Sequence, residues 1–293
     1  MSGLVLLGAA AELPPGDGWL GPQERATLLR WRAPQRRRDF RLGRFTARRA
    51  LALLEDRLEA PPHFEVRRGP GGVPLAFCDG ASLPVTLSIS HSDGWAAVAV
   101  HRGSEPLGCD LEHVEPRSAA FLFDYFTPRE RAFVAEGTDL ERSLRSTLVW
   151  SAKEAVMKAL GEGLRLPPAT VEVSLAWGRM PSGTWRPFSV LGPPRANPLR
   201  GFWRAVGAFV LTVAGGQGEP RFIETCSSAA ATAKRDEGVV PGRDGAESAR
   251  PMREAVGQAE AEEEPLSSSD QHAGRHSRRG LADQSGQGVD AHL

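Results

Sequence analysis

Every Trp, Phe and Tyr in this chain of 293 residues lies before residue 226. Beyond that point Ser, Gly, Ala, Glu and Gln dominate, and biased stretches such as EAEEEP and SSSDQHAGRHSRRG replace the apolar runs. A segment of this composition cannot bury enough apolar surface to offset the entropy that it loses on ordering. We therefore expect residues 226–293 to form a disordered low-complexity tail, and we expect the fold and its chemistry within residues 1–225.

Residues 1–225 alternate between helical and strand-like patterns. Apolar side chains at helical spacing predict helices at residues 22–33, 37–58, 128–135 and 140–160, the last with an internal break. Runs rich in β-branched and aromatic residues predict strands at residues 4–7, 64–67, 85–89, 95–100, 107–112, 171–175, 185–190 and 203–213, with a hairpin turn at residues 91–94. The alternation predicts a mixed α and β fold in two parts, residues 1–114 and 115–225.

The composition excludes several classes of protein. No apolar run approaches the ~20 residues of a membrane span, and the N-terminal run lacks the basic segment of a signal peptide. The three cysteines have no paired spacing, which predicts buried thiols in a reducing, cytoplasmic compartment rather than a disulfide or a zinc site. Before residue 226 basic side chains outnumber acidic ones, which suits phosphate groups or an acidic protein partner.

Two carboxylates alternate on a predicted strand in Gly108-Cys109-Asp110-Leu111-Glu112. Asp110 and Glu112 share one face of the strand, because side chains two residues apart point the same way, and Leu111 faces the core. Carboxylates this close repel each other unless a cation lies between them, and Mg²⁺ is a natural occupant. The alternative is a solvated strand edge with two acids, which the motif alone favours.

A second cluster lies in Trp150–Lys158, which reads WSAKEAVMK. On a helix Glu154 and Lys158 are neighbours on one face, and Lys153 lies beside Glu154. Glu154 would then complete a three-carboxylate metal site flanked by two ammonium groups that hold phosphates, and it could accept a proton from an attacking hydroxyl. The alternative is a surface ion pair worth ~0.3–0.5 kcal/mol.

Two further stretches offer phosphate contacts. Ser88–Ser92, which reads SISHS, supplies hydroxyls and an imidazole, and Arg67–Pro74, which reads RRGPGGVP, combines arginines with glycines whose N–H groups can approach a phosphate. The alternatives are an ordinary polar hairpin turn and an ordinary Gly/Pro turn. No G-x-S-x-G surrounds the serines, which argues against a hydrolase nucleophile.

Arginines at helical spacing form a basic stripe: Arg37, Arg41, Arg44 and Arg48. Most such stripes are solvated faces. Few aromatic residues are interleaved and no nucleic-acid motif is present, so we expect no nucleic-acid binding and favour an acidic ligand or partner.

In their order and combination these motifs resemble those of the Sfp-type 4′-phosphopantetheinyl transferases. That family has a [VI]-G-[VI]-D-x-E strand and, downstream, a [FW]-[SCT]-x-K-E-[SA]-x-x-K helix. The helix motif is matched in full by Trp150–Lys158, and the strand motif is matched by Leu107–Glu112 with apolar departures at Leu107 and Cys109.

The resemblance extends upstream and covers roughly residues 25–225. Ser88–Ser92 is similar to the family's I-S-H-S turn, and Gly43-Arg44 is similar to its G-R helix motif. Arg68–Pro74 is similar to its Gly-Lys-Pro loop, except that Val73 stands where many members have lysine, a charge that Arg68 could supply.

The resemblance implies an α+β fold of two similar α/β halves related by pseudo-twofold symmetry, with coenzyme A between them. It implies an enzyme that transfers 4′-phosphopantetheine from coenzyme A to a serine hydroxyl of an apo acyl or peptidyl carrier protein, with Mg²⁺ as cofactor and release of 3′,5′-ADP. The carrier would be an acidic protein of fatty-acid, polyketide or nonribosomal-peptide biosynthesis. We expect a monomer that binds no membrane.

The resemblance also implies roles for individual residues. Mg²⁺ would be held by Asp110, Glu112 and Glu154, and Glu154 with Lys153 would be catalytic. Coenzyme A would contact Arg44, Arg68, Gly72, Val73, Pro74, Ser88, Ser90, His91, Lys153 and Lys158.

Other functions compete with this one. A metal-dependent phosphohydrolase would use the same acids with water as the nucleophile. A module that binds coenzyme A or a carrier protein would need no turnover, and an arginine-rich nucleic-acid binder would lose affinity steeply with salt.

Overall fold

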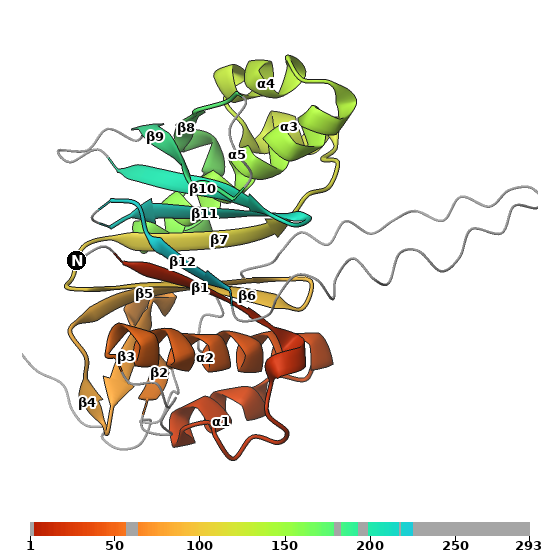
Figure 1. Ribbon diagram of the computed structural model, residues 1–293. Coiled ribbons are helices and arrows are strands. Elements are labelled where there is room, and N and C mark those ends of the chain that lie inside the picture. Colours follow the sequence, from red (N-terminus) through yellow and green to blue (C-terminus); the bar gives the residue numbers. More distant parts are fainter. Residues whose placement is uncertain (1–2, 57–63, 179–182, 193–198, 217, 225–293) are drawn as a thin grey trace, which may run out of the picture. The chain divides into compact units, whose positions relative to one another are not determined.

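The computed structural model describes residues 3–56, 64–178, 183–192, 199–216 and 218–224 (Figure 1). The predicted tail, residues 226–293, lies outside the described residues, as do the last two residues of the helix predicted at 37–58. The helices are α1 (Pro22–Arg30), α2 (Pro34–Leu54), α3 (Ala119–Tyr125), α4 (Pro128–Ala135) and α5 (Asp139–Ala159). Short 3₁₀ turns lie at Ala10–Glu12, Pro70–Gly72, Gly163–Arg165 and Pro168–Thr170.

The described strands form three sheets. The first has the order β12-β1-β6-β5, with β1 (Leu4–Ala9), β5 (Val85–Ser92), β6 (Trp95–Arg102) and β12 (Arg221–Glu224). The second has the order β7-β11-β10-β9-β8, with β7 (Leu107–His113), β8 (Glu172–Leu175), β9 (Arg186–Gly192), β10 (Arg200–Val206) and β11 (Phe209–Gly215). The third contains β2 (Phe64–Arg68), β3 (Pro74–Cys78) and β4 (Ala81–Ser82). The predicted α+β class is confirmed.

Strand β1 is buried along its whole length because both of its faces are covered. Leu4 and Leu6 pack with α2 residues in one core cluster, while Val5 and Leu7 pack with β7 and β11 residues in another. Side chains alternate across a strand, so a continuous apolar run is what a strand between two layers requires. Figure 1 shows α2 on the far side of this first sheet from β7 and β11.

Helix α5 is unbroken, which corrects the predicted internal break. Thr138 caps its start, accepting a hydrogen bond from the N–H of Glu141, whose carboxylate in turn accepts from the N–H of Thr138. No Gly or Pro occurs between Asp139 and Ala159, so nothing in the sequence interrupts the helical hydrogen bonds.

Two predicted strand boundaries are wrong for local reasons. The run predicted as one strand at 203–213 is two strands, β10 and β11, that turn at Gly207, whose φ is 57°. The hairpin turn predicted at 91–94 is tighter, because His91 and Ser92 belong to β5 and only Asp93 (φ 44°) and Gly94 (φ 79°) form the turn. An Asp-Gly pair with positive φ at both residues is typical of a two-residue hairpin loop.

The boundary between the two parts at residues 114 and 115 stays a prediction. Each of the two larger sheets contains one strand from the other side of this boundary. Strand β7 precedes the boundary but pairs with β11, and β12 follows it but pairs in parallel with β1. Helix α3 and strands β3, β4 and β12 were not predicted. Among the described residues, no helix is long and apolar enough to cross a membrane.

Candidate functional site

Helix α5 lies directly on strand β7 because Gly108 has no side chain. A Cβ atom at Gly108 would be 1.9 Å from the carbonyl oxygen of Ala155 and 2.5 Å from the nitrogen of Ala159. The approach is therefore between the two backbones, and no other residue fits. It brings the last two turns of α5 against the face of β7 that carries Asp110 and Glu112.

A buried hydroxyl pair fixes α5 on the neighbouring strand. The Oγ atoms of Ser151 and Thr212 are 2.9 Å apart, and Thr212 also donates to the carbonyl oxygen of Ser151 at 2.9 Å. Both residues are fully buried, so breaking the pair would leave unsatisfied polar atoms in the core.

Asp110, Ser90 and Lys158 form a cluster contributed by β7, β5 and α5. One carboxylate oxygen of Asp110 accepts hydrogen bonds from the Oγ of Ser90 at 2.8 Å and from the Nζ of Lys158 at 2.7 Å. The same Nζ donates to the Oγ of Ser90 at 3.1 Å and lies 3.6 Å from the carboxylate of Glu154. The structure thus brings Ser90, Asp110, Glu154 and Lys158 together. Leu111 lies in the core on the opposite face of β7.

Glu112 lies at the edge of this cluster and has its own cation. The Nη2 of Arg117 is 2.9 Å from the carboxylate of Glu112, and its Nη1 is 3.0 Å from that of Glu115. The guanidinium also lies over the ring of Phe121 on α3, 5.1 Å from its centroid. Arg117 therefore ties Glu112 to α3, a role that sequence reasoning missed.

Burial raises the pKa of both glutamates. The pKa of Glu112 is raised to about 8, first by loss of solvent and then by the charge of Asp110, and Arg117 opposes the shift. The pKa of Glu154 is raised to about 7 by the same two causes, and Lys158 opposes the shift. The pKa of Lys158 is raised because Asp110 and Glu154 together outweigh the effect of its burial. The site holds more negative charge than its own cations balance.

The carboxylate oxygens of Asp110, Glu112 and Glu154 are suitable ligands for a hard divalent cation, but they are not arranged around a single point. Among the described residues, no group of three or more His, Cys, Asp and Glu side chains is arranged to hold a metal ion. The second carboxylate oxygen of Asp110 is nevertheless buried without a hydrogen-bond partner. An orphaned carboxylate oxygen beside two glutamates with raised pKa values is the environment that a divalent cation would relieve.

Lys153 is not brought to this cluster, which corrects its predicted role as a phosphate contact and catalytic partner. Its side chain is fully buried, its Nζ is 2.7 Å from the carboxylate of Glu130, and it donates to the carbonyl oxygens of Pro168 and Val171. Burial lowers the pKa of Lys153 and raises that of Glu130, while the charge of each partner opposes the other's shift. With all its donors engaged inside the C-terminal part, Lys153 anchors α5.

Glu130 is the partner that sequence reasoning missed. It caps the start of α4 by accepting from the N–H of Thr127 at 2.8 Å, and it accepts from the N–H of Val173 at 2.9 Å. The sequence Thr127-Pro128-Arg129-Glu130 has the capping-box spacing, which could have located this carboxylate at a helix start. Its pairing with Lys153, 23 positions along the chain, has no local signal.

The predicted residues of β5 have different roles. Ser88 is buried, and its Oγ accepts from the N–H of Cys109 at 2.9 Å, so it joins β5 to β7. His91 is half exposed, with its Nδ1 4.0 Å from a carboxylate oxygen of Asp39 on α2. Loss of solvent lowers the pKa of His91, and Asp39 opposes the shift.

Arg44 lies in the N-terminal part, on the helix that packs against β5. A Cβ at the preceding residue, Gly43, would be 3.0 Å from the Cγ2 of Ile89, so α2 approaches β5 closely there. The guanidinium of Arg44 lies 4.4 Å from the centroid of the Phe40 ring and 3.8 Å from the carboxylate of Glu24. Its buried Nε is the atom closest to that carboxylate but makes no hydrogen bond, and burial lowers the pKa of Arg44 to about 10.

The glycine loop lies beside the C-terminal end of α5. Gly71 and Gly72 have positive φ, 67° and 85°, and the Nε and Nη2 of Arg68 are 3.6 Å from where a Cβ of Gly72 would be. Val73 lies with its Cγ2 3.7 Å from the Cβ position of Gly161, and Pro74 begins β3. The loop thus approaches the turn that follows Lys158.

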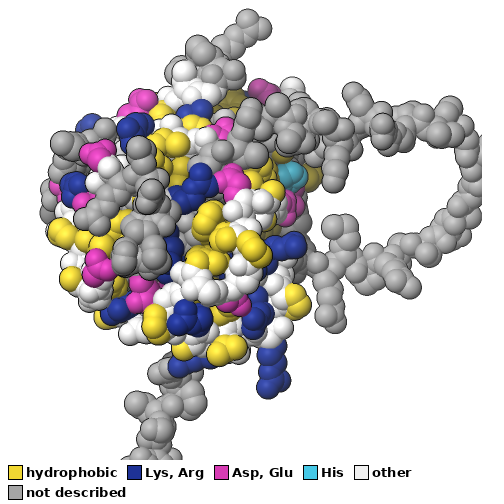
Figure 2. All heavy atoms as spheres, turned by 60° about the horizontal axis from the view of Figure 1, so that its bottom comes forward, with side chains coloured by type: hydrophobic (Ala, Val, Ile, Leu, Met, Phe, Trp, Pro, Cys, Tyr) yellow, Lys and Arg dark blue, Asp and Glu magenta, His cyan; other side chains and the backbone are white. Residues whose placement is uncertain are grey.

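Most of the predicted basic stripe is engaged within the chain. Arg41 pairs with Asp17 and donates to the carbonyl oxygens of Pro14 and Gly16, and Arg48 pairs with the buried Glu24. On the face that Figure 2 presents, basic side chains lie between acidic and hydrophobic ones rather than in one patch. These arginines hold the N-terminal loop in place and do not form a free basic surface.

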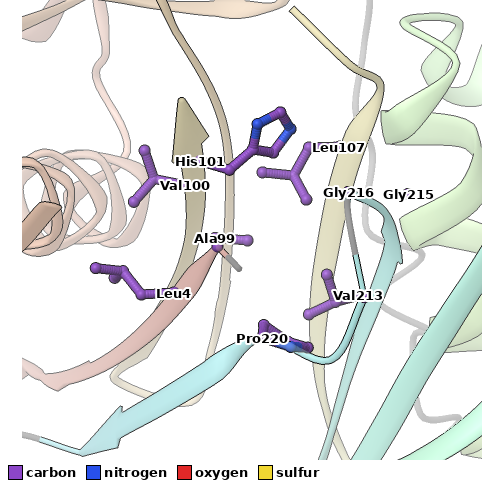
Figure 3. Close-up of a pocket in the computed structure, with 11 residues that line it drawn as sticks. Leu4, Ala99, Val100, His101, Leu107, Val213, Gly215, Gly216 and Pro220 are labelled. Carbon is purple, nitrogen blue, oxygen red and sulfur yellow. The ribbon is translucent and has the colours of Figure 1, made fainter. Parts of the chain in front are cut away.

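One small pocket has none of the acids in its lining. It is lined by residues of β1, β6, β7 and β11 and of the segment before β12, including His101, Leu107 and Pro220 (Figure 3). Both ring nitrogens of His101 face carbonyl oxygens, those of Arg102 at 2.8 Å and Glu105 at 3.1 Å. The pocket contains none of the predicted site residues.

Comparison with known proteins identifies one family model and several relatives. A family model described as the 4′-phosphopantetheinyl transferase superfamily matches residues 106–213. Sfp of Bacillus subtilis, a 4′-phosphopantetheinyl transferase, is 32% identical over 89 residues, which cover 30% of this chain and 39% of Sfp. The 4′-phosphopantetheinyl transferase HetI of Nostoc is 27% identical over 176 residues, or 54% of this chain and 71% of HetI. A putative 4′-phosphopantetheinyl transferase of Synechocystis is 28% identical over 157 residues, or 52% and 61% of the two chains.

These matches confirm the resemblance to the Sfp-type 4′-phosphopantetheinyl transferases that the two motifs predict, and the names of the family and of the relatives indicate that enzyme class. The chain spans 39% of the length of Sfp and 61–71% of the two cyanobacterial relatives. The matched region, residues 106–213, includes Asp110, Glu112, Glu154 and Lys158.

Proposed function

We propose that this chain transfers the 4′-phosphopantetheine arm of coenzyme A to a serine hydroxyl of an apo acyl or peptidyl carrier protein. The observation that carries the proposal is the convergence of Asp110 with Glu154 and Lys158, which lie 44 and 48 positions further along the chain, in one partly buried cluster. The family match and the relatives' names support the same activity.

The proposed reaction is a displacement at phosphorus. The serine oxygen bonds to the phosphorus that carries the pantetheine arm, the bridging P–O bond of the pyrophosphate breaks, and 3′,5′-ADP leaves with that oxygen. Glu154 accepts the hydroxyl proton, because its carboxylate belongs to the same cluster as the ammonium group of Lys158, 3.6 Å away, that faces the pyrophosphate. Lys158, held by Asp110, offers its ammonium group to the pyrophosphate oxygens.

Asp110, Glu112 and Glu154 would hold a Mg²⁺ ion. The orphaned oxygen of Asp110 and the raised pKa values of both glutamates support this donor set. When bound, Mg²⁺ supplies positive charge against the phosphate oxygens on which negative charge develops. Ser88 and His91 would line the nucleotide side from β5, and Arg44 and Arg68 would contact its phosphate.

We also propose that the two α/β halves are related by pseudo-twofold symmetry. Glu24 in the N-terminal part and Glu130 in the C-terminal part each stand at the third position of a helix, accept from the N–H of the capping residue and accept from the N–H of a strand residue. Each also pairs with a buried cation of the following long helix, Arg48 or Lys153. This repetition supports a duplicated scaffold.

The decisive measurement is the mass of a carrier protein after incubation with the enzyme, coenzyme A and Mg²⁺. We expect the carrier to gain the mass of phosphopantetheine with the wild-type protein, to gain almost none with Asp110→Asn, and to gain the full mass with the control Asp139→Asn, which alters a 99% exposed carboxylate. Release of phosphate from coenzyme A without a carrier mass gain would indicate a phosphohydrolase. Binding of coenzyme A without either reaction would indicate a binding module.

A further inference from the structure

An arginine of the C-terminal part faces the glycine loop of the N-terminal part. The Nη2 of Arg165 is 3.2 Å, and its Nη1 3.9 Å, from where a Cβ atom of Gly71 would be. The guanidinium of Arg68 stands in the same relation to the next residue, Gly72, at 3.6 Å. Two guanidinium groups, one from each part of the chain, therefore flank two consecutive glycines.

Arg165 is held in this position by its own turn. Its Nη2 donates to the carbonyl oxygen of Gly161 at 2.8 Å, and it belongs to the 3₁₀ turn Gly163–Arg165. Gly161 in turn donates its N–H to the carbonyl oxygen of Lys158 at 3.0 Å. The guanidinium is thus connected through a few hydrogen bonds to the residue that carries the ammonium group of the acid cluster.

The surroundings favour an anion. Gly71 and Gly72 are exposed and have positive φ, so their backbone presents no side chain that would block a ligand. Arg68 is exposed. The carboxylate that pairs with Arg165 among the described residues, that of Glu162, is 3.7 Å away and half exposed, so water screens its charge. Paired guanidinium groups with accessible backbone are typical of phosphate recognition.

We propose that Arg165 adds a second guanidinium to the phosphate contact already assigned to Arg68, so that the two arginines form a cradle around Gly71 and Gly72 for a phosphate group of coenzyme A; this inference rests on the proposed function. Arg165 is then a binding residue supplied by the C-terminal part to the loop of the N-terminal part. The bound phosphate would then contact guanidinium groups from both parts of the chain.

The chain offers a closely matched control for Arg165. Arg142 is 53% exposed and pairs with an acid three residues before it, Asp139, whereas Arg165 is 52% exposed and pairs with Glu162, also three residues before it. Arg165→Gln and Arg142→Gln therefore remove the same charge and the same kind of ion pair, but only the first removes a guanidinium from the glycine loop.

The test is isothermal titration of the full chain with coenzyme A and, separately, with inorganic pyrophosphate. We expect Arg165→Gln to weaken both affinities about tenfold, the loss of one charge-assisted contact, Arg142→Gln to change them less than twofold, and Arg165→Lys to fall between. Equal affinities for Arg165→Gln and the wild-type protein would contradict the proposal that Arg165 binds the phosphate group.

The two ligands separate this inference from the function on which it rests. Binding of pyrophosphate that depends on Arg165, without binding of coenzyme A, would uphold a phosphate site at Arg165 but contradict its assignment to coenzyme A and the proposed function. Binding of coenzyme A that is unaffected by Arg165→Gln would uphold the function and contradict the cradle. If the wild-type protein bound neither ligand, both would be overturned.

Discussion

The N-terminal and C-terminal parts of this protein contain the same buried anchor built with different cations. In the first, Glu24 on α1 pairs with Arg48 on α2 at 2.5 Å, and in the second, Glu130 on α4 pairs with Lys153 on α5 at 2.7 Å. Both carboxylates also accept two backbone N–H groups, so each joins a helix start, a strand and a long helix.

The difference lies in what the cation does besides pairing. Arg48 also donates to the carbonyl oxygen of Trp19 and lies over its ring, whereas Lys153 uses its donors on two carbonyl oxygens near the start of β8. A compact ammonium group suits the second position because its three donors are satisfied within a small space. The residue that follows Lys153 is Glu154 of the acid cluster. The anchor of the C-terminal part thus lies next to the acid cluster in sequence, whereas the anchor of the N-terminal part holds the N-terminal loop.

The largest expected effect comes from removing either cation. Lys153→Met would leave the buried carboxylate of Glu130 without its cation, and Arg48→Met would leave that of Glu24 with only the more distant Arg44, 3.8 Å away. We expect each substitution to lower the free energy of unfolding by about 3–5 kcal/mol, with the larger loss at Lys153. Urea denaturation followed by circular dichroism measures this loss.

A double-mutant cycle tests whether the two anchors are equivalent. Adding Glu130→Gln to Lys153→Met, and Glu24→Gln to Arg48→Met, should recover a similar part of the loss in both parts of the chain. A coupling energy near zero at one anchor alone would break the comparison.

A smaller loss of stability is expected from adding a methyl group where a long helix lies close to a strand, and it should differ between α5 on β7 and α2 on β1. Gly108→Ala would force a Cβ against the backbone of α5, and we expect a loss of about 3 kcal/mol. The corresponding contact of α2 is with a side chain, because a Cβ at Gly8 would lie 2.7 Å from the Oγ1 of Thr46, which can rotate. We therefore expect Gly8→Ala to cost about 1 kcal/mol, measured by the same denaturation. Equal costs would show that α5 adjusts as freely as α2.

The smallest expected effect is the change in stability with pH that Glu112 and Glu154 cause. It distinguishes the acid cluster from the two anchors. Because the pKa values of Glu112 and Glu154 are raised to about 8 and about 7, the folded chain retains protons that the unfolded chain has released above pH ~4.5. Stability contributed by these groups is therefore present at low pH and lost as pH rises towards 8.

Thermal unfolding between pH 5 and pH 8.5 measures this dependence. We expect Tm to fall by a few degrees across the range without divalent cations, and Glu154→Gln to reduce the fall. Mg²⁺ should restore Tm more at pH 8 than at pH 6. A Tm that rises with pH would contradict the raised pKa values.

The sequence alone located the acids because strand and helix periodicities are local. The placement of Asp110 and Leu111 on opposite faces of β7 follows from alternation, and that of Glu154 and Lys158 follows from helical spacing. The close approach that unites these two elements could have been suspected from Gly108, but its partner atoms on α5 depend on the tertiary fold.

The role of Lys153 could not be predicted in the same way. It is adjacent to Glu154 in sequence, but neighbours on a helix point about 100° apart, so one faces the acid cluster and the other the core. Which lysine faces which side depends on Glu130 and on the carbonyl oxygens near β8. Arg117 and Arg165 were missed because a single arginine outside a strand or an α-helix belongs to no periodic pattern.

Strand β12 has a consequence for any shortened form of the protein. It borders β1, whose residues Leu4–Leu7 are apolar and buried. Ending the chain before Arg221 would remove β12 and expose the backbone N–H and C=O groups along one edge of β1. Because β1 is apolar, this exposed edge would promote self-association by strand pairing. The shortest stable version should therefore retain Glu224, even though the family match ends at residue 213.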